Sequence, residues 1–158
     1  MSSALLSLLK TCAAIERECA GLYHWLSDLF CDDRKVSALW NRTALVEENH
    51  ESQFILAVKL SDGILAVPLI EQATADAQLE WLRNLRRELE ENPPDLIRAL
   101  ETAMFIEEQL ERFHLENVLL YSNDDHRRMF MAMMAHDQDH TDSLKRFFEE
   151  VISSRGDV

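Results

Sequence analysis

Apolar residues recur at helical spacing along most of this 158-residue chain. Apolar side chains that repeat every three or four residues form one face of an amphipathic helix. This pattern predicts four long helices, over residues 3–30, 34–60, 95–121 and 125–152. The segment Cys31–Asp33 breaks the first helix and caps the second, and Pro94 or Asp95 opens the third.

Residues 61–94 form a long connection between the second and third helices. Residues 64–70 are apolar and contain Pro68, which favours an extended or irregular segment. From Thr74 to Glu91 the apolar residues again have helical spacing among many charges, which predicts a short extra helix on the outside. A connection of this length lets the chain cross the length of a helical bundle. We therefore expect one all-α domain, a four-helix bundle with a crossover, over residues 1–158.

The composition supports helices and limits the classes of partner. Only 3 Gly and 3 Pro occur, which favours long uninterrupted helices. The formal net charge of -13 argues against nucleic acid or an anionic membrane as partner, because both require basic patches. No apolar run reaches the length of a membrane span, and Met1–Leu6 lacks the basic region of a secretory signal. With 3 Cys and no Cys-x-x-Cys pair, we expect no disulfide framework and a cytoplasmic protein.

Acidic residues interrupt the faces that should be buried. Glu16 lies in the middle of the apolar stripe of the first helix, so it should have a partner, because an unpaired buried carboxylate is unfavourable. Alternatively, Glu16 lies at the edge of the stripe and reaches water. Glu47 and His50 lie one turn apart on the inner face of the second helix. Glu-x-x-His is the ligand pair of dinuclear carboxylate bundles.

The second half of the chain repeats these residues at nearly constant spacing. Four pairs are related in this way, the first two 91 residues apart and the others 90 apart: Glu16 and Glu107, Tyr23 and His114, Glu47 and Asp137, His50 and His140. Two divalent ions carry about four positive charges, which four carboxylates can neutralise. The pattern therefore predicts a site for two metal ions, with these ligands: Glu16, Glu47, His50, Glu107, Asp137 and His140.

These motifs resemble the rubrerythrin-like branch of the ferritin-like carboxylate proteins. The resemblance covers nearly the whole chain and is carried by the segments Glu16–Tyr23, Glu47–His50, Glu107–His114 and Asp137–His140. It implies a ferritin-like bundle with two iron ions, or manganese or mixed metals, that reacts with hydrogen peroxide or oxygen. It also implies a homodimer, and a catalytic role for Tyr23 as a hydrogen-bond partner of a ligand carboxylate or intermediate.

Three features depart from the pattern of this family. Asp137 is one methylene shorter than Glu, so it reaches only one metal or makes the site asymmetric. His114 stands where the second Tyr is expected, about 10 Å from Glu107 along a continuous helix, so we expect it behind the ligands or at the surface. The sequence has no Cys-x-x-Cys pair for a rubredoxin-type iron, so the resemblance implies a separate electron-donor protein. His136, four residues before His140, is an alternative ligand to Asp137.

Three functions fit these residues. The first is an oxidoreductase that reduces peroxide or oxygen, and the second is a protein that binds or stores iron or manganese, or senses oxidants, without turnover. The third is a structural bundle in which the acids and histidines only pair with one another. Cys12 and Cys19 flank Glu16 on its face. We expect them to be buried and inert, although a thiol beside a peroxide site can be redox-active.

Overall fold

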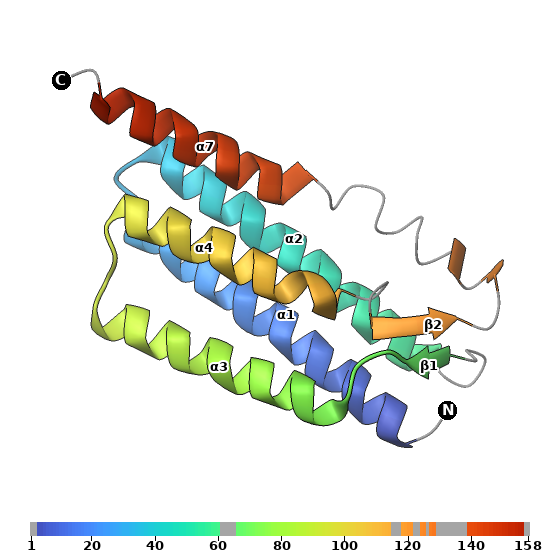
Figure 1. Cartoon of the computed structure of the whole chain (residues 1–158). Helices are drawn as coiled ribbons and strands as arrows, with labels where there is room; N and C mark the ends of the chain where they lie inside the picture. Colours follow the sequence, from blue (N-terminus) through green and yellow to red (C-terminus); the bar gives the residue numbers. More distant parts are fainter. Residues whose placement is uncertain are drawn as a thin grey trace.

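The structure is a computed structural model that describes residues 3–60, 66–114, 118–121, 124–125, 127–128 and 139–156 (Figure 1). Most of the described residues belong to α-helices, as the sequence predicts. The helices are α1 (Ser3–Leu29), α2 (Arg34–Lys59), α3 (Gln72–Glu91), α4 (Leu96–Leu110) and α7 (Asp139–Gly156). A small antiparallel sheet of β1 (Ala66–Pro68) and β2 (Leu119–Tyr121) is the departure from an all-α fold. None of the described helices combines the length and apolar character needed to cross a bilayer.

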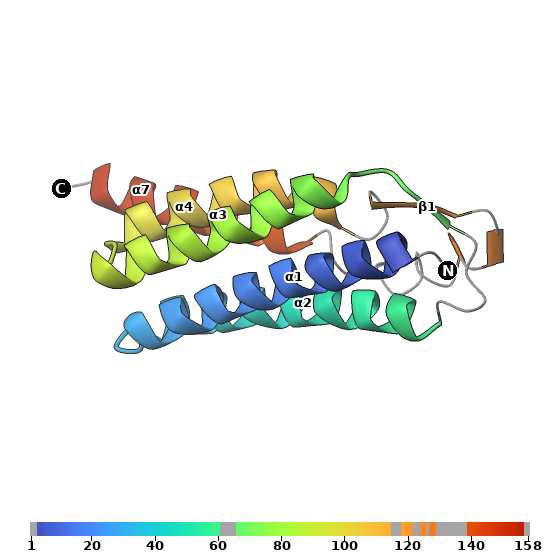
Figure 2. The ribbon, with the colours of Figure 1, turned by 90° about the horizontal axis from the view of Figure 1, so that it is seen from below.

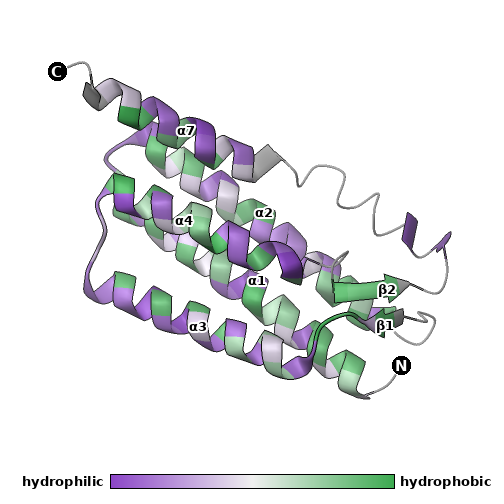
Figure 3. Ribbon diagram, in the orientation of Figure 1, coloured by the Kyte–Doolittle hydropathy of each residue, from purple (hydrophilic) through white to green (hydrophobic). Residues whose placement is uncertain are grey.

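The helices lie in two layers. Figure 2 shows α1 and α2 in one layer and α3, α4 and α7 in the other. Hydrophobic and hydrophilic residues alternate around the helices (Figure 3), as expected where one face of each packs on its neighbours. The core between them contains large, fully buried side chains, among them Tyr23, Trp40, Phe54, Leu82, Leu100 and Ile106.

Carboxylate caps set the starts of two helices. Asp33 accepts hydrogen bonds from the backbone amides of Lys35 and Val36 at 2.9 and 3.2 Å. Asp95 accepts one from the amide of Arg98 at 2.9 Å. These amides lie in the first helical turn and have no carbonyl partner within the helix. The starts of α2 and α4 therefore agree with the sequence prediction.

The helix α3 lies in the predicted connection but is not short. It has 20 residues, contacts α1, and buries Leu82 and Leu89. On its polar side, Arg86 donates to Glu18 of α1 at 3.2 Å and to Glu90 at 2.8 Å. This helix is thus part of the second layer rather than an addition outside the bundle. It runs back along the length of the molecule (Figure 1), so α4 runs parallel to α2.

The third predicted helix, over residues 95–121, is interrupted in the described part of the chain. The helix α4 ends at Leu110, and a 3-10 helix, Glu111–Phe113, follows. His114 already has an extended backbone, with φ -61° and ψ 149°. The cause is tertiary, because Phe113 is fully buried in the core and β2 pairs with β1. Strand pairing replaces the helical hydrogen bonds at Leu119–Tyr121, so packing overrides local helix propensity there.

Part of the fourth predicted helix, residues 125–152, lies outside the described residues. The helix α7 covers the end of that range and continues to Gly156. His136 and Asp137 are outside the described part of the chain, so the structure does not place them. The backbone of His140 belongs to the first turn of α7, while its side chain is not described.

Candidate metal centre

Three carboxylates from three helices are buried between the two layers. Glu16 of α1 and Glu47 of α2 are 0% exposed, and Glu107 of α4 is 4% exposed. Each lies within the apolar face of its helix, because the residues one turn before and after it are also buried. The alternative in which Glu16 reaches water is therefore wrong.

The imidazole of His50 lies close to two of these carboxylates, those of Glu47 and Glu16. Its Nδ1 lies 3.2 Å from Oε2 of Glu47 and 3.8 Å from Oε2 of Glu16. The imidazole is itself buried, with 3% exposed. Glu47 and His50 therefore share the inner face of α2 and face Glu16, as their spacing of three residues predicts.

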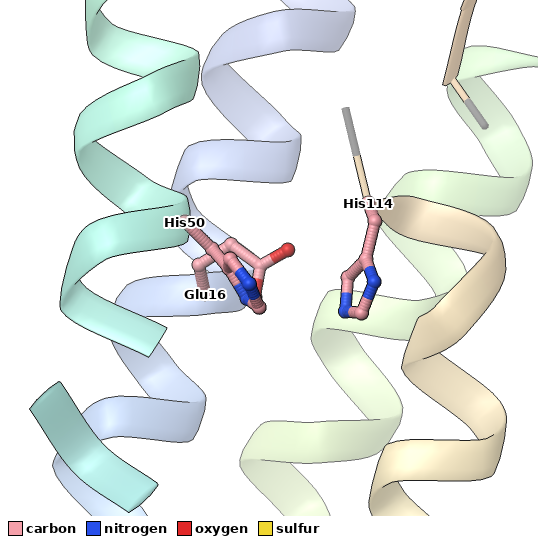
Figure 4. Close-up of side chains that lie close together, drawn as sticks. All are labelled: Glu16, His50 and His114. Atoms are coloured by element: carbon pink, nitrogen blue, oxygen red, sulfur yellow. The ribbon is translucent and has the colours of Figure 1, made fainter. Parts of the chain in front are cut away.

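His114 lies in the same cluster, and the expectation that it stays outside the ligand set is not supported. The ligand atoms of Glu16, His50 and His114 all lie within 4.8 Å of one another. The two imidazole rings are 4.6 Å apart between centroids and are tilted by 47°. Figure 4 shows them on opposite sides of a common space, with the carboxylate of Glu16 beside His50 and directed toward His114. The expectation assumed a continuous helix, but the chain turns after Leu110.

A second group lies next to the first. The ligand atoms of Cys19, Glu47 and Glu107 are also within 4.8 Å of one another, and all three residues are buried. The hydroxyl of Tyr23 donates to Oε1 of Glu107 at 2.5 Å. The ring of Tyr23 stacks on Trp40, with centroids 6.0 Å apart. Tyr23 therefore bonds a carboxylate of the cluster, Glu107, while its catalytic role stays a prediction.

Burial disfavours the charged forms of several groups in this cluster. Burial raises the pKa of Glu47, the hydrogen bond from His50 lowers it, and the neighbouring Glu16 raises it, with a net upward shift. Burial also raises the pKa of the Cys19 thiol and of the Tyr23 hydroxyl, and the adjacent carboxylates act in the same direction. Tyr23 therefore keeps its proton and acts as a donor toward Glu107.

The Glu16 carboxylate indicates that a positive charge belongs in this cluster. Neither of its oxygens accepts a hydrogen bond from a described residue, although both are buried. A buried polar group that lacks a hydrogen bond costs about 1–3 kcal/mol. Carboxylates, imidazoles and a thiol are ligands that first-row transition metal ions accept. The residues present therefore fit such an ion, and the two adjacent groups provide donor atoms for two.

Two further sequence predictions concern the surroundings of the cluster. Cys12 is buried, and burial together with the charge of Glu16 raises the pKa of its thiol to about 12, so an inert role agrees with its environment. Asp137 would be the fourth carboxylate, but it lies outside the described residues. Among the described side chains, the carboxylates in this cluster are Glu16, Glu47 and Glu107.

Comparison of the chain with protein-family models, with curated proteins and with solved structures finds no match.

Proposed function

We propose that this protein is a ferritin-like carboxylate protein that binds two iron ions, or manganese in their place, and reacts with hydrogen peroxide or oxygen. Among the residues that the structure describes, the proposed metal ligands are Glu16, Glu47, His50 and Glu107. The observation that carries the proposal is the Glu16 carboxylate, which is fully buried while neither oxygen accepts a hydrogen bond from a described residue. The proposal also includes Asp137 and His140, because the repeat of the sequence relates them to Glu47 and His50.

The order and direction of the helices support the ferritin-like part of the proposal. The first hairpin is formed by α1 and α2, and α4 and α7 run in opposite directions in the second layer (Figures 1 and 2). The connection that contains α3 joins α2 to α4, which run parallel. In ferritin-like folds a long crossover joins two helical hairpins in this way, and the metal ligands project inward from the four helices.

The residues of the cluster suit the reduction of a small oxidant. The chemistry that a bound ferrous pair would supply is the two electrons that convert hydrogen peroxide and two protons into two water molecules. The hydroxyl oxygen of Tyr23 lies 2.5 Å from Oε1 of Glu107, so Tyr23 donates a hydrogen bond that orients this carboxylate. The buried side chains of Trp40 and Phe54 lie on the inner face of α2 and exclude water from the core around the cluster.

Two parts of the proposal rest on the family resemblance, a separate electron-donor protein and a homodimer. A cytoplasmic location is proposed from the cysteine usage. The three cysteines, Cys12, Cys19 and Cys31, are free rather than disulfide-bonded, which agrees with a reducing compartment.

A second candidate function is favoured by the enclosure of the cluster. Glu16, Cys19 and Glu47 are fully buried, and such enclosure suits a metal that is held rather than one that turns over. In this alternative the protein binds or stores iron or manganese, or senses an oxidant, without efficient catalysis.

Metal analysis tests both candidates. Protein purified without chelator should contain about two transition metal ions per chain, and Glu47→Ala should lose them. Glu48→Ala is the matched control, because Glu48 is the next residue on α2 but bonds to His24 at 2.8 Å on the exposed side. If anaerobic iron addition loads no metal, both candidates are rejected, and metal retention by Glu47→Ala rejects this site.

The reaction of the ferrous protein separates the two candidates. Fast oxidation by hydrogen peroxide, slow oxidation by oxygen and repeated turnover with an artificial electron donor support the oxidoreductase. Stoichiometric metal binding with a single slow oxidation supports the binding or sensing protein. Tyr23→Phe should slow the peroxide reaction while leaving the metal content unchanged, because it removes only the hydroxyl that donates to Glu107.

A further inference from the structure

His114 occupies a place in the cluster that its sequence position does not predict. It follows the 3-10 helix after α4, and this turn brings its imidazole to the ligand atoms of Glu16 and His50. The spacing of 4.8 Å or less among the three ligand atoms is close to that of atoms that share one metal ion, whose bonds to nitrogen and oxygen are about 2.0–2.2 Å. Figure 4 shows Glu16 and His50 on one side of a common space and His114 on the other.

The internal repeat gives His114 an equivalent residue with a different chemistry. His114 follows Tyr23 by 91 residues, as Glu107 follows Glu16. The structure places the corresponding residues near each other across the repeat, since Tyr23 donates a hydrogen bond to Glu107 and a ligand atom of His114 lies within 4.8 Å of one of Glu16. A phenol that keeps its proton can only donate a hydrogen bond to a carboxylate, whereas a neutral imidazole also offers a lone pair to a metal.

The Glu16 carboxylate distinguishes these two contacts. Glu107 accepts the hydrogen bond of Tyr23 at 2.5 Å, but no described residue donates to Glu16, and His114 is no exception. The ring of His114 is therefore close to Glu16 but does not donate a hydrogen bond to it, whereas Tyr23 does donate one to Glu107. An ion between the two would use donor atoms of both.

We propose that His114 is a metal ligand, and that Glu16, His50 and His114 form a two-histidine, one-carboxylate position distinct from the neighbouring position of Cys19, Glu47 and Glu107. This inference rests on the proposed function and makes the two metal positions chemically unequal. The first offers two nitrogens and a carboxylate, a set that holds ferrous iron in other protein sites. The second offers two carboxylates and a thiol. Because imidazole nitrogens suit ferrous iron and Co(II) better than carboxylate oxygens do, the first position should fill before the second.

Titration of the metal-free protein with Co(II) tests this assignment, because Co(II) reports its ligands through visible absorption and through shifted ring N–H proton resonances. The wild type should bind in two steps. His114→Ala and His114→Tyr should each weaken the first step by about 100-fold or more, since even groups behind the ligands are worth 10–100-fold. Both variants should also lose one shifted imidazole resonance.

His114→Tyr is the decisive variant, because it places a phenol next to Glu16, just as Tyr23 places one next to Glu107. If this variant keeps the first binding step and the full set of imidazole resonances, His114 only positions Glu16, and the inference is overturned. His24→Ala is the matched control, since this histidine bonds to Glu48 away from the cluster, and it should bind Co(II) as the wild type does. Unchanged helical circular dichroism verifies the fold of each variant.

The outcomes separate this inference from the proposed function. If the wild type binds no Co(II), the proposed function fails and the inference fails with it. If the wild type binds two ions and the His114 variants bind them equally well, the proposed function stands and the inference alone is rejected.

Discussion

At the scale of single residues, Glu16 is the side chain whose environment is hardest to explain without a cation. It is fully buried, and neither oxygen accepts a hydrogen bond from the described residues. Its position in the apolar stripe of α1 made its burial predictable from the sequence. The same reasoning gives Glu47 and His50 their inner position, because three residues on a helix span about one turn.

Glu16→Gln should change stability in opposite directions with and without metal. Gln is nearly isosteric, and its amide group can donate hydrogen bonds, so the metal-free variant should be more stable than the wild type by about 1–3 kcal/mol, since a buried carboxylate that accepts no hydrogen bond from a described residue is removed. Added Fe(II) or Co(II) should stabilise the wild type and not the variant. Urea unfolding of both proteins, with metal and with chelator, measures the two differences.

Glu18→Gln provides the control for this experiment. Glu18 lies on the same helix, but its carboxylate accepts a hydrogen bond from Arg86 at 3.2 Å. Its substitution should not stabilise the metal-free protein and should leave the metal effect intact. A Glu16→Gln variant that is less stable than the wild type under chelator would contradict the view that this carboxylate lacks compensation.

His114 shows where prediction from the sequence reaches its limit. The repeat relates it to Tyr23, but distance along a continuous helix would place it about 10 Å from Glu107. The end of α4 at Leu110 depends on the burial of Phe113 and on the pairing of β2 with β1. These contacts join segments far apart in the sequence, so local periodicity does not contain them.

At the scale of elements, the sequence predicted helices where local signals suffice. The carboxylate caps Asp33 and Asp95 mark the starts of α2 and α4, and the spacing of apolar residues marks α1 and α3. Local signals fail in the segment around β2, where leucines compatible with a helix form a strand. Strand preference depends on neighbouring strands, so it is poorly determined by sequence alone.

Asp33→Ala should reduce the free energy of unfolding by about 1 kcal/mol. The substitution removes the acceptor of the amides of Lys35 and Val36, and these amides have no helical carbonyl to replace it. Chemical denaturation monitored by circular dichroism measures the loss. Asp32→Ala removes a neighbouring exposed carboxylate that makes no such cap, so it should change stability by less than about 0.5 kcal/mol.

The cap also separates folding from metal binding. Asp33 lies at the end of α2 remote from Glu47 and His50, more than three helical turns away by the rise of 1.5 Å per residue. Metal affinity of Asp33→Ala should therefore equal that of the wild type. A large loss of affinity would mean that the start of α2 and the cluster are coupled, in contrast to the local role proposed for the cap.

At the scale of the whole molecule, the buried carboxylates lie in a chain that already carries a formal net charge of -13. Two layers of helices place Glu16, Glu47 and Glu107 at their common interior. Self-repulsion of the surface and desolvation of the interior both disfavour further negative charge. The metal-free fold should therefore lose stability where Glu47 ionises, because burial raises the pKa of this carboxyl, and a bound cation should reverse this dependence.

The stability of the metal-free protein should fall as the pH rises from about 5 through the pKa of Glu47 in the folded state. Burial raises the pKa of Glu47 above its ordinary value of 4.5, so in this window the folded protein binds more protons than the unfolded chain. The associated stability is fully present below pH 4.5 and is lost as the pH rises through the pKa of the folded state.

Urea midpoints measured at several pH values under chelator test this pH dependence of stability, and Glu47→Gln should flatten it. Glu48→Gln removes the same charge from the surface, so it corrects for general repulsion and should keep the slope. With Co(II) present the wild type should instead gain stability with pH, because ligands must lose their protons to bind metal. Equal slopes for Glu47→Gln and Glu48→Gln would show that Glu47 is not the group that titrates.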